Sequence, residues 1–307
     1  MPSSTVAYRS GFVALVGRPN VGKSTLVNSL MRQKIAAVSP RPQTTRRRQL
    51  GILSLEQAQI VFVDTPGIHR PLHKLGEFMN QESLKALEHV DGIVWLVDAS
   101  QPPHEEDRLV AAHLAALKAP PVILALNKID LVKSEAERAK SREAFLAIFP
   151  CVNTVMLSAL DGRGQGELLD LLIALLPPGE PLYDTEQITD LYERDIAADL
   201  VREAALEYLR EEVPYSLAVR VDEYTERGDS GAFIHATIFV ERDSHKGIVI
   251  GRGGEMLKKI GAAARRQIEL MSGRKVFLEL KVKVSKNWRN DPQALRFLGY
   301  VREENRK

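Results

Sequence analysis

Gly17-Arg18-Pro19-Asn20-Val21-Gly22-Lys23-Ser24 decides the fold class, because this stretch fits the phosphate-loop pattern G-x-x-x-x-G-K-[ST]. The apolar run Phe12–Val16 precedes it and predicts a buried strand, and Ser24–Leu30 opens a helix-like segment. The glycines let backbone N–H groups converge on phosphate oxygens, and the helix N-terminus adds positive potential. We expect Gly17 to Thr25 to bind phosphates, with Lys23 reaching the outer phosphates and the Ser24 hydroxyl ligating magnesium.

A second apolar run, Ile60–Val63, predicts another strand that ends in Asp64-Thr65-Pro66-Gly67. A carboxylate at a strand end can hold magnesium through water, and the Gly67 N–H can meet a terminal phosphate. Alone, this tetrapeptide would more often be a plain turn. Its place after the phosphate loop favours a role for Asp64 and Gly67 in nucleotide binding.

Two later motifs select the base. The run Val122–Leu126 ends in Asn127-Lys128-Ile129-Asp130, and the Asp130 carboxylate can accept both guanine N1–H and N2–H. Adenine lacks that pair of donors. The run Val155–Leu157 leads into Ser158-Ala159-Leu160, whose backbone can meet the guanine O6.

The four motifs in this order resemble those of the translation-factor-type GTPases: G-x-x-x-x-G-K-S, D-x-x-G, N-K-x-D and S-A-x. Asn127-Lys128 alone would more often be a solvated loop, but the joint spacing makes coincidence a poor explanation. The resemblance implies an α/β P-loop GTPase domain with a mostly parallel sheet flanked by helices. It also implies GTP or GDP and Mg²⁺ as ligands, with Ser24, Thr45 and Asp64 at the metal.

Composition limits the remaining possibilities. A chain of 307 residues predicts about two domains, and 44% hydrophobic residues suffice for their cores. The single cysteine, Cys151, excludes an internal disulfide framework, fits a reducing cytosol and is expected to be a buried structural thiol. The N-terminus lacks a secretory signal pattern, and no apolar run approaches the length of about 20 residues that spans a bilayer.

The net charge of +2 is unevenly distributed. Residues 245–307 hold 16 Lys and Arg against 6 Asp and Glu, a balance of +10, whereas residues 1–244 carry −8. An acidic first part joined to a basic tail indicates a polyanion as partner of the tail.

A break in the pattern divides the chain. Leu168–Leu176 predicts the last helix of the nucleotide domain, and Pro177–Pro181 interrupts regular structure. We expect a GTPase domain over residues 1–178, a polar and partly mobile linker over 179–195, and a second domain over 196–307.

The second domain alternates between helical and strand periodicity. The predicted elements are a helix over Ile196–Leu209, strands over Tyr215–Tyr224 and Phe233–Val240 with a hairpin turn at Arg227–Gly231, a helix over Glu255–Met271 and a last strand over Val276–Val284.

This order resembles a type II KH domain, and Gly251-Arg252-Gly253-Gly254 matches the G-x-x-G loop of that family. Composition alone predicts a strand at Ile248–Ile250, whereas the resemblance implies a short helix there. The KH loop lets its backbone approach four nucleotides of a single strand. The resemblance thus implies an RNA clamp with flanking basic residues, although these residues could instead form a solvated helix face: Lys246, Arg252, Lys258, Lys259, Arg265 and Arg266.

A phosphate-loop GTPase followed by a KH domain resembles the Era family of bacterial ribosome-assembly GTPases. Pro42-Gln43-Thr44-Thr45-Arg46 and Lys286-Asn287-Trp288-Arg289 extend the resemblance over nearly the whole chain. It implies a GTP-controlled protein that binds the 3′ region of small-subunit ribosomal RNA during 30S maturation. It also implies a cytoplasmic protein with peripheral association at the inner membrane, and we expect a monomer.

Hydrolysis should involve Lys23, Thr45, Gly67 and Asn20. Spacing does not separate Thr45 from Thr44 as the switch threonine of the polar loop over residues 33–48, whose order the nucleotide would control. Ile68 stands where Ras-like GTPases keep a water-orienting glutamine, so intrinsic hydrolysis should be slow. Asn20 could support a K⁺ ion beside the phosphates, as in related GTPases, or could only hydrogen-bond its own loop.

Three functions remain open from the sequence. The chain could be a GTPase switch, a constitutive RNA-binding assembly factor with structural GTP, or a GTPase recruited to anionic lipid through its basic tail. The set Lys23, Ser24, Asp64 and Gly67 favours the switch. The exact RNA sequence, the resting nucleotide state and the exchange or activating partners are not encoded in these motifs.

Overall fold

A computed structural model describes residues 7–39, 41, 44–117, 120–226, 228 and 231–300. The chain divides into two compact units. Unit 1 comprises Met1–Ile35, Thr45–Arg70 and Met79–Asp190, and unit 2 comprises Ala36–Thr44, Pro71–Phe78 and Leu191–Lys307. The division falls between Asp190 and Leu191, inside the predicted linker. It also places Thr44 and Thr45 in different units.

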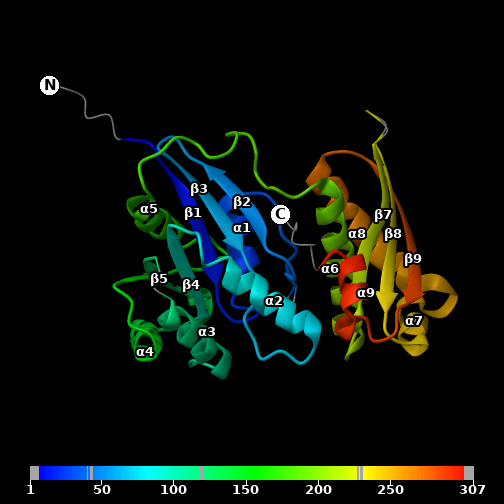
Figure 1. Cartoon of the computed structure of the whole chain (residues 1–307), viewed down its shortest axis with the longest axis horizontal. Coiled ribbons are helices and arrows are strands. Elements are labelled where there is room, and N and C mark those ends of the chain that lie inside the picture. Colours follow the sequence, from blue (N-terminus) through cyan, green and yellow to red (C-terminus); the bar gives the residue numbers. More distant parts are fainter. Residues whose placement is uncertain are drawn as a thin grey trace. The chain divides into compact units, whose positions relative to one another are not determined.

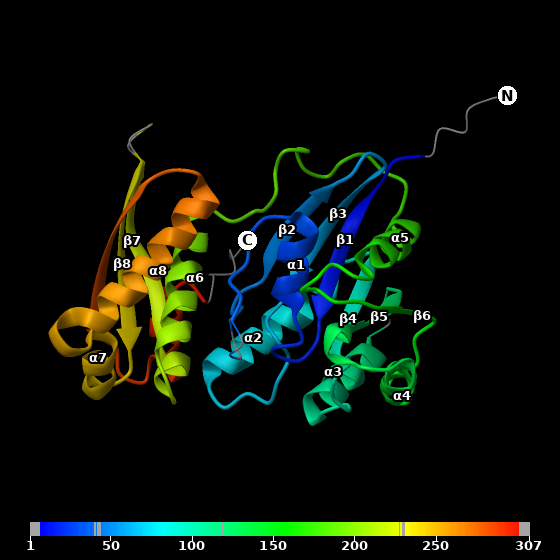
Figure 2. The ribbon, with the colours of Figure 1, turned by 180° about the vertical axis from the view of Figure 1, so that it is seen from behind.

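Unit 1 contains a six-stranded sheet in the order β2-β3-β1-β4-β5-β6 (Figure 1, with β6 labelled in Figure 2). Only β2 is antiparallel to its neighbour, and the other pairings are parallel. The strands are β1 (Arg9–Val16), β2 (Gln49–Ser54), β3 (Ala58–Asp64), β4 (Gly92–Asp98), β5 (Val122–Asn127) and β6 (Asn153–Met156). The predicted apolar runs are therefore strands, and their polar ends meet at the carboxyl edge of the sheet.

Helices cover both faces of this sheet. Helices α1 (Lys23–Met31) and α5 (Gln165–Leu175) contribute Leu26 and Leu168 to one apolar core. On the other face, α3 (Glu105–Ala116) and α4 (Glu135–Leu146) pack around the buried Trp95 of β4. Helix α2 spans Lys74–Lys85. Alternate residues of the same strands feed the two cores, as expected of a sheet that is buried on both faces.

The segment after α5 follows the edge of the sheet in unit 1. The Gln59 side chain accepts from Tyr183 N at 2.9 Å and donates to Tyr183 O at 2.9 Å. The Ile52 N–H donates to Ile188 O at 2.9 Å, and Leu50 N donates to Asp190 Oδ1 at 3.0 Å. The bonds from Ile52 and Leu50 satisfy outward-facing donors of the edge strand β2, which would otherwise stay unpaired.

Unit 2 has the predicted order of helix, two strands, two helices and strand. It contains α6 (Glu193–Tyr208), β7 (Ala218–Glu226), β8 (Ala232–Val240), α7 (Asp243–Ile250), α8 (Glu255–Ser272), β9 (Val276–Val284) and α9 (Pro292–Phe297). Strand β8 is antiparallel to β7 and parallel to β9. Helices α6 and α8 pack on this sheet through one apolar core (Figure 2).

Unit 2 contradicts one local prediction at Tyr215 and decides between two at Ile248–Ile250. Tyr215 lies in the 3₁₀ helix Val213–Ser216 and not in the strand, because Pro214 fixes a turn there. The run Ile248–Ile250 is helical, as the KH resemblance implied and composition did not. Part of the predicted turn Arg227–Gly231 lies outside the described residues, as do Pro42 and Gln43. Within the described ranges, no helix is long and apolar enough to cross a membrane.

Candidate functional site

The phosphate loop joins β1 to α1 with a backbone that only small residues tolerate. Gly17 and Gly22 have φ of 155° and 102°, and Asn20 has φ of 64°. A Cβ on Gly17 would lie 2.3 Å from Leu96 O, and one on Gly22 would lie 2.4 Å from Asn127 Nδ2. Glycine is required at both positions because the loop passes so close to its neighbours.

Lys23 is folded back onto this loop. Its Nζ donates to Gly17 O and to Arg18 O, each at 3.0 Å, and the residue is 6% exposed. Burial lowers the pKa of Lys23 to about 8, although Asp64 nearby favours the charged form. The ammonium group is thus held where phosphate oxygens would relieve the cost of burying its charge.

Ser24, Thr45 and Asp64 meet at one point. Ser24 Oγ donates to Asp64 Oδ2 at 2.8 Å and lies 2.7 Å from Thr45 Oγ1. Thr44 instead donates to Arg41 O at 2.9 Å, so the geometry favours Thr45 as the switch threonine. Burial raises the pKa of Asp64, against the opposing effects of Lys23 and the hydrogen bonds from Ser24, Gln49 and Thr45.

This cluster fits a magnesium ion. Asp64 Oδ1 is buried and has no hydrogen-bond partner among the described residues. A free carboxylate oxygen beside two hydroxyls is a donor set of the kind that Mg²⁺ prefers. Gln49 on β2 donates to Asp64 Oδ2 at 3.2 Å, and sequence reasoning missed it because this edge strand follows a polar loop.

Gly67 lies directly against the phosphate loop. A Cβ at this position would come within 2.5 Å of Pro19 N, so a side chain would push the two loops apart. Ile68 is fully buried and its N–H donates to Gly17 O at 3.2 Å. The Ile68 side chain therefore belongs to the core, and it offers no hydrogen bond to a water molecule.

The base-reading motifs are joined to each other and to the phosphate loop. Asn127 Nδ2 donates to Val21 O at 2.7 Å, and Asn127 Oδ1 accepts from Ala159 N at 2.8 Å. Ser158 Oγ donates to Asp130 Oδ1 at 2.7 Å, which orients the exposed carboxylate. Leu160 is 79% exposed beside this loop. The predicted base-reading residues thus lie together at one edge of the sheet.

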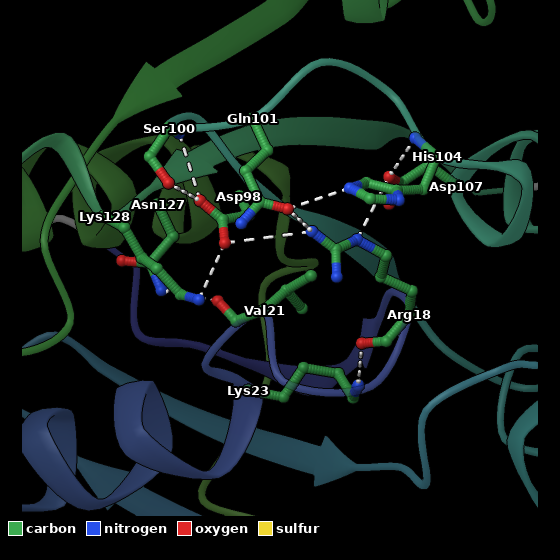
Figure 3. Close-up of polar contacts among 10 residues, drawn as sticks. All are labelled: Arg18, Val21, Lys23, Asp98, Ser100, Gln101, His104, Asp107, Asn127 and Lys128. Atoms are coloured by element: carbon green, nitrogen blue, oxygen red, sulfur yellow. Dashed lines mark hydrogen bonds and ion pairs between the residues drawn. The ribbon is translucent and has the colours of Figure 1, made fainter. Parts of the chain in front are cut away.

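Arg18 behaves differently from the other loop residues. Its guanidinium group donates to Asp107 Oδ2 at 3.2 Å and to Gln101 Oε1 at 3.4 Å (Figure 3). Burial raises the pKa of Asp107, although the His104 N–H and Arg18 both favour its charged form. Arg18 therefore anchors the loop through its side chain and can offer only its backbone to phosphates.

In unit 2, the G-x-x-G loop lies between α7 and α8. Gly251, Gly253 and Gly254 have φ of 72°, 60° and 81°, which residues with a Cβ rarely adopt. A Cβ on Gly251 would lie 2.7 Å from Met256 Cβ, whereas one on Gly253 or Gly254 would meet nothing within 4 Å. Gly251 thus serves packing, and the other two glycines leave the backbone open to a ligand.

Basic side chains surround this loop. Arg252, Lys258 and Lys259 are exposed, and Lys246 is partly buried. Arg265 and Arg266 are exposed further along α8. The predicted RNA-binding residues therefore occupy one loop and its flanking helices.

Asp98 was also missed by sequence reasoning. It ends the apolar run of β4, and its neighbour in the parallel register is Asn127 of β5. The rule that ligands bind beyond the carboxyl ends of parallel strands could have indicated it.

Two family models match the chain. One is described as a 50S ribosome-binding GTPase and matches residues 12–128, and the other is described as a KH domain and matches residues 212–289. The two matched ranges follow each other in the predicted order, with the GTPase model before the KH model.

Proteins named GTPase Era are similar to this chain over nearly their whole length. The protein of Geotalea daltonii is 45% identical over 293 residues, which are 95% of this chain and 98% of that protein. The protein of Carboxydothermus hydrogenoformans is 44% identical over 302 residues, which are 97% of this chain and 100% of that protein.

Two solved structures of Era proteins are also similar to this chain over nearly its whole length. Era in complex with MgGDPNP and nucleotides 1506–1542 of 16S ribosomal RNA matches with a TM-score of 0.91 and 40% identity, over 96% of this chain and 100% of that one. An Aquifex aeolicus Era variant bound to GDP·AlF₄⁻ matches with a TM-score of 0.90 and 39% identity, over the same shares of the two chains. This chain therefore belongs to the Era family of GTPases.

Proposed function

We propose that this GTPase is a nucleotide-controlled switch that binds the 3′ region of small-subunit ribosomal RNA and assists maturation of the 30S subunit. The observation that carries the proposal is the meeting of Ser24, Thr45 and Asp64. This arrangement joins the phosphate loop, the loop before β2 and the end of β3 at one point. A ligand bound by these three groups would fix the path of the loop that contains Thr45, and loss of the ligand would release that loop.

The chain's own residues provide binding and orientation. Lys23 would turn from the two carbonyls of its loop to the outer phosphates, and Gly67 would offer its N–H to the terminal phosphate. Asp130, oriented by Ser158, would accept from the guanine edge. Magnesium held by Ser24, Thr45 and Asp64 would neutralise charge on the phosphate oxygens. Ile68 cannot orient water, so we expect slow intrinsic turnover.

RNA binding is assigned to the G-x-x-G loop. Gly253 and Gly254 leave open space above the backbone, and Arg252 is exposed beside them. The structure of Era with nucleotides 1506–1542 of 16S ribosomal RNA supports the small subunit as the partner of this chain. The family model that matches residues 12–128 is described instead as a 50S ribosome-binding GTPase. A binding experiment should therefore compare ribosomal RNA of the small subunit with that of the large subunit.

Three finer features complete the proposal. Asn20, whose φ is 64°, would support a K⁺ ion beside the phosphates, as the resemblance to related GTPases implies. The protein would act as a cytoplasmic monomer. Its basic tail, residues 245–307, would allow peripheral association with the anionic inner membrane, and RNA would compete for the same basic residues.

GTP turnover and RNA affinity test the switch directly. We expect an RNA that carries the 3′ end of the small-subunit ribosomal RNA to bind with different affinity in the GDPNP and GDP states, and to alter GTP turnover. Equal RNA affinity in the two states, with unaltered turnover, would favour a constitutive RNA-binding factor in which GTP is structural.

A further inference from the structure

Asp98 lies between the base-reading loop and the phosphate loop (Figure 3). It ends β4, and its carboxylate is 4% exposed. Lys128 Nζ donates to Asp98 Oδ2 at 2.7 Å. Because water is largely excluded from the carboxylate, this bond is stronger than an ion pair at the surface.

The other oxygen of Asp98 is also fixed. Asp98 Oδ1 accepts from Ser100 N at 3.0 Å and from Ser100 Oγ at 2.6 Å. Burial alone would raise the pKa of Asp98, but the hydrogen bonds from Lys128 and Ser100 outweigh it and lower that pKa. The carboxylate therefore stays ionised at neutral pH and has a single orientation.

The same carboxylate faces the phosphate loop. Arg18 Nη2 lies 3.8 Å from Asp98 Oδ2, while Arg18 Nε donates to Asp107 at 3.2 Å. The carbonyl of Arg18 accepts from Lys23 Nζ at 3.0 Å. Asp98 is thus within reach of charged groups from both loops, with the short hydrogen bond to Lys128 as its main contact.

Lys128 needs such a contact. Its backbone is left-handed, with φ of 65°, and it lies between the end of β5 and the 3₁₀ helix Ile129–Leu131. No regular element sets the direction of its side chain, which is 31% exposed. A lysine whose ammonium group is held at one end can lay its carbon stem along a flat apolar surface.

We propose that Asp98 is a positioning residue for guanine-nucleotide binding, which holds the Lys128 side chain along the plane of the base. The inference rests on the proposed nucleotide site. It adds a residue that touches neither phosphate nor base and acts through Lys128. Its effect should fall on GTP and GDP alike, because the two nucleotides share the base.

The variant Asp98→Asn tests this role. An amide keeps the shape and the oxygen that Ser100 contacts, but it loses the charge that holds Lys128. We expect the Kd values for GTP and GDP each to rise about tenfold, the size of one hydrogen bond to a charged group. The rate of hydrolysis of bound GTP should stay unaltered. Glu135→Gln is the matched control, since it removes an exposed carboxylate that pairs with Arg138 at 3.5 Å.

A double-mutant cycle with Lys128→Met separates positioning from general damage. If Asp98 acts through Lys128, the double variant should bind GTP no more weakly than Lys128→Met alone. Additive losses would overturn the proposal. If Asp98→Asn fails to fold, Ser100→Ala can replace it, because Ser100 is exposed and its hydroxyl helps to fix the Asp98 carboxylate. Unaltered GTP and GDP affinity in the Ser100 variant would also overturn the proposal.

The outcomes distinguish this inference from the proposed function. An unaltered protein that binds no GTP would contradict the proposed function itself. A protein that binds GTP equally well before and after Asp98→Asn would contradict only the role of Asp98.

Discussion

Ser24 Oγ donates a hydrogen bond to Asp64 Oδ2 across 2.8 Å, which joins the start of α1 to the end of β3. Asp64 keeps its other oxygen buried and without a hydrogen-bond partner among the described residues. Such an oxygen is costly to bury unless a ligand completes it. The relationship between these two residues thus indicates where magnesium would bind.

Asp64→Asn should remove most of the magnesium dependence of GTP binding. A group that holds the ion through water is worth about 10- to 100-fold in metal affinity. We expect the ratio of GTP affinity in Mg²⁺ to that in EDTA to fall by this factor. Asp161→Asn is the control, because Asp161 pairs with Arg163 in an exposed position. An unaltered ratio in the Asp64 variant would remove Asp64 from the metal site.

The lowered pKa of Lys23 predicts that nucleotide binding is linked to proton uptake. Its pKa of about 8 means that the ligand-free protein loses the Lys23 charge as the pH rises through that value. Phosphates favour the ammonium form, so binding above pH 8 must take up a proton, and affinity must fall. Calorimetry of GDP binding in two buffers of different ionisation heat should give close to one proton taken up at pH 9, and much less at pH 7.5. Absence of uptake at pH 9 would contradict the assignment.

The G-x-x-G loop can be tested with a variant that should fold. Gly253→Asp has open space around its Cβ, and Asp tolerates a positive φ better than most residues. RNA affinity should fall by roughly tenfold, the size of one charge-assisted contact, because the anion faces RNA phosphates. GTP affinity should not change.

Gly273→Asp is the matched control for that variant. It also has a positive φ and open space around its Cβ, but it caps the opposite end of α8. Equal loss of RNA affinity in both variants would show that the loss comes from the added negative charge and not from a contact between the G-x-x-G loop and RNA.

Potassium should accelerate hydrolysis relative to sodium at equal ionic strength, if Asn20 supports a cation site. Holding ionic strength fixed is necessary because screening alone alters phosphate electrostatics. Asn20→Asp and Asn20→Ala should weaken the difference between the two salts more than they weaken GTP binding. Asn20→Gly separates loss of the amide from backbone strain, since glycine also lacks the amide but adopts φ of 64° without strain. Equal rates in both salts for the unaltered protein would exclude the idea.

The sequence predicted those features that depend on local pattern. Asp64 and Asp130 follow apolar runs, so the place of Asp64 at the end of a strand and that of Asp130 just beyond one could be read directly. Tyr215 was assigned to a strand because alternation outweighed the turn signal of Pro214. The helix at Ile248–Ile250 required the KH resemblance, since three β-branched residues favour a strand by composition.

Other features depend on contacts between distant segments. Thr44 and Thr45 are equivalent by spacing, and only the approach of Ser24 distinguishes them. Gln49 and Asp98 carry no motif of their own. They were missed because strand order decides which carboxylates and amides share an edge.

Exchange of the base recognised by Asp130 tests the central claim, that a guanine nucleotide controls this protein. Asp130→Asn replaces a double acceptor with an amide, which suits xanthine and not guanine. The unaltered protein should hydrolyse GTP much faster than xanthosine triphosphate. The variant should hydrolyse xanthosine triphosphate faster than GTP. RNA affinity of the variant should then respond to xanthine nucleotides as that of the unaltered protein responds to guanine nucleotides. A variant with unaltered GTP affinity and no gain for xanthosine triphosphate would contradict the account.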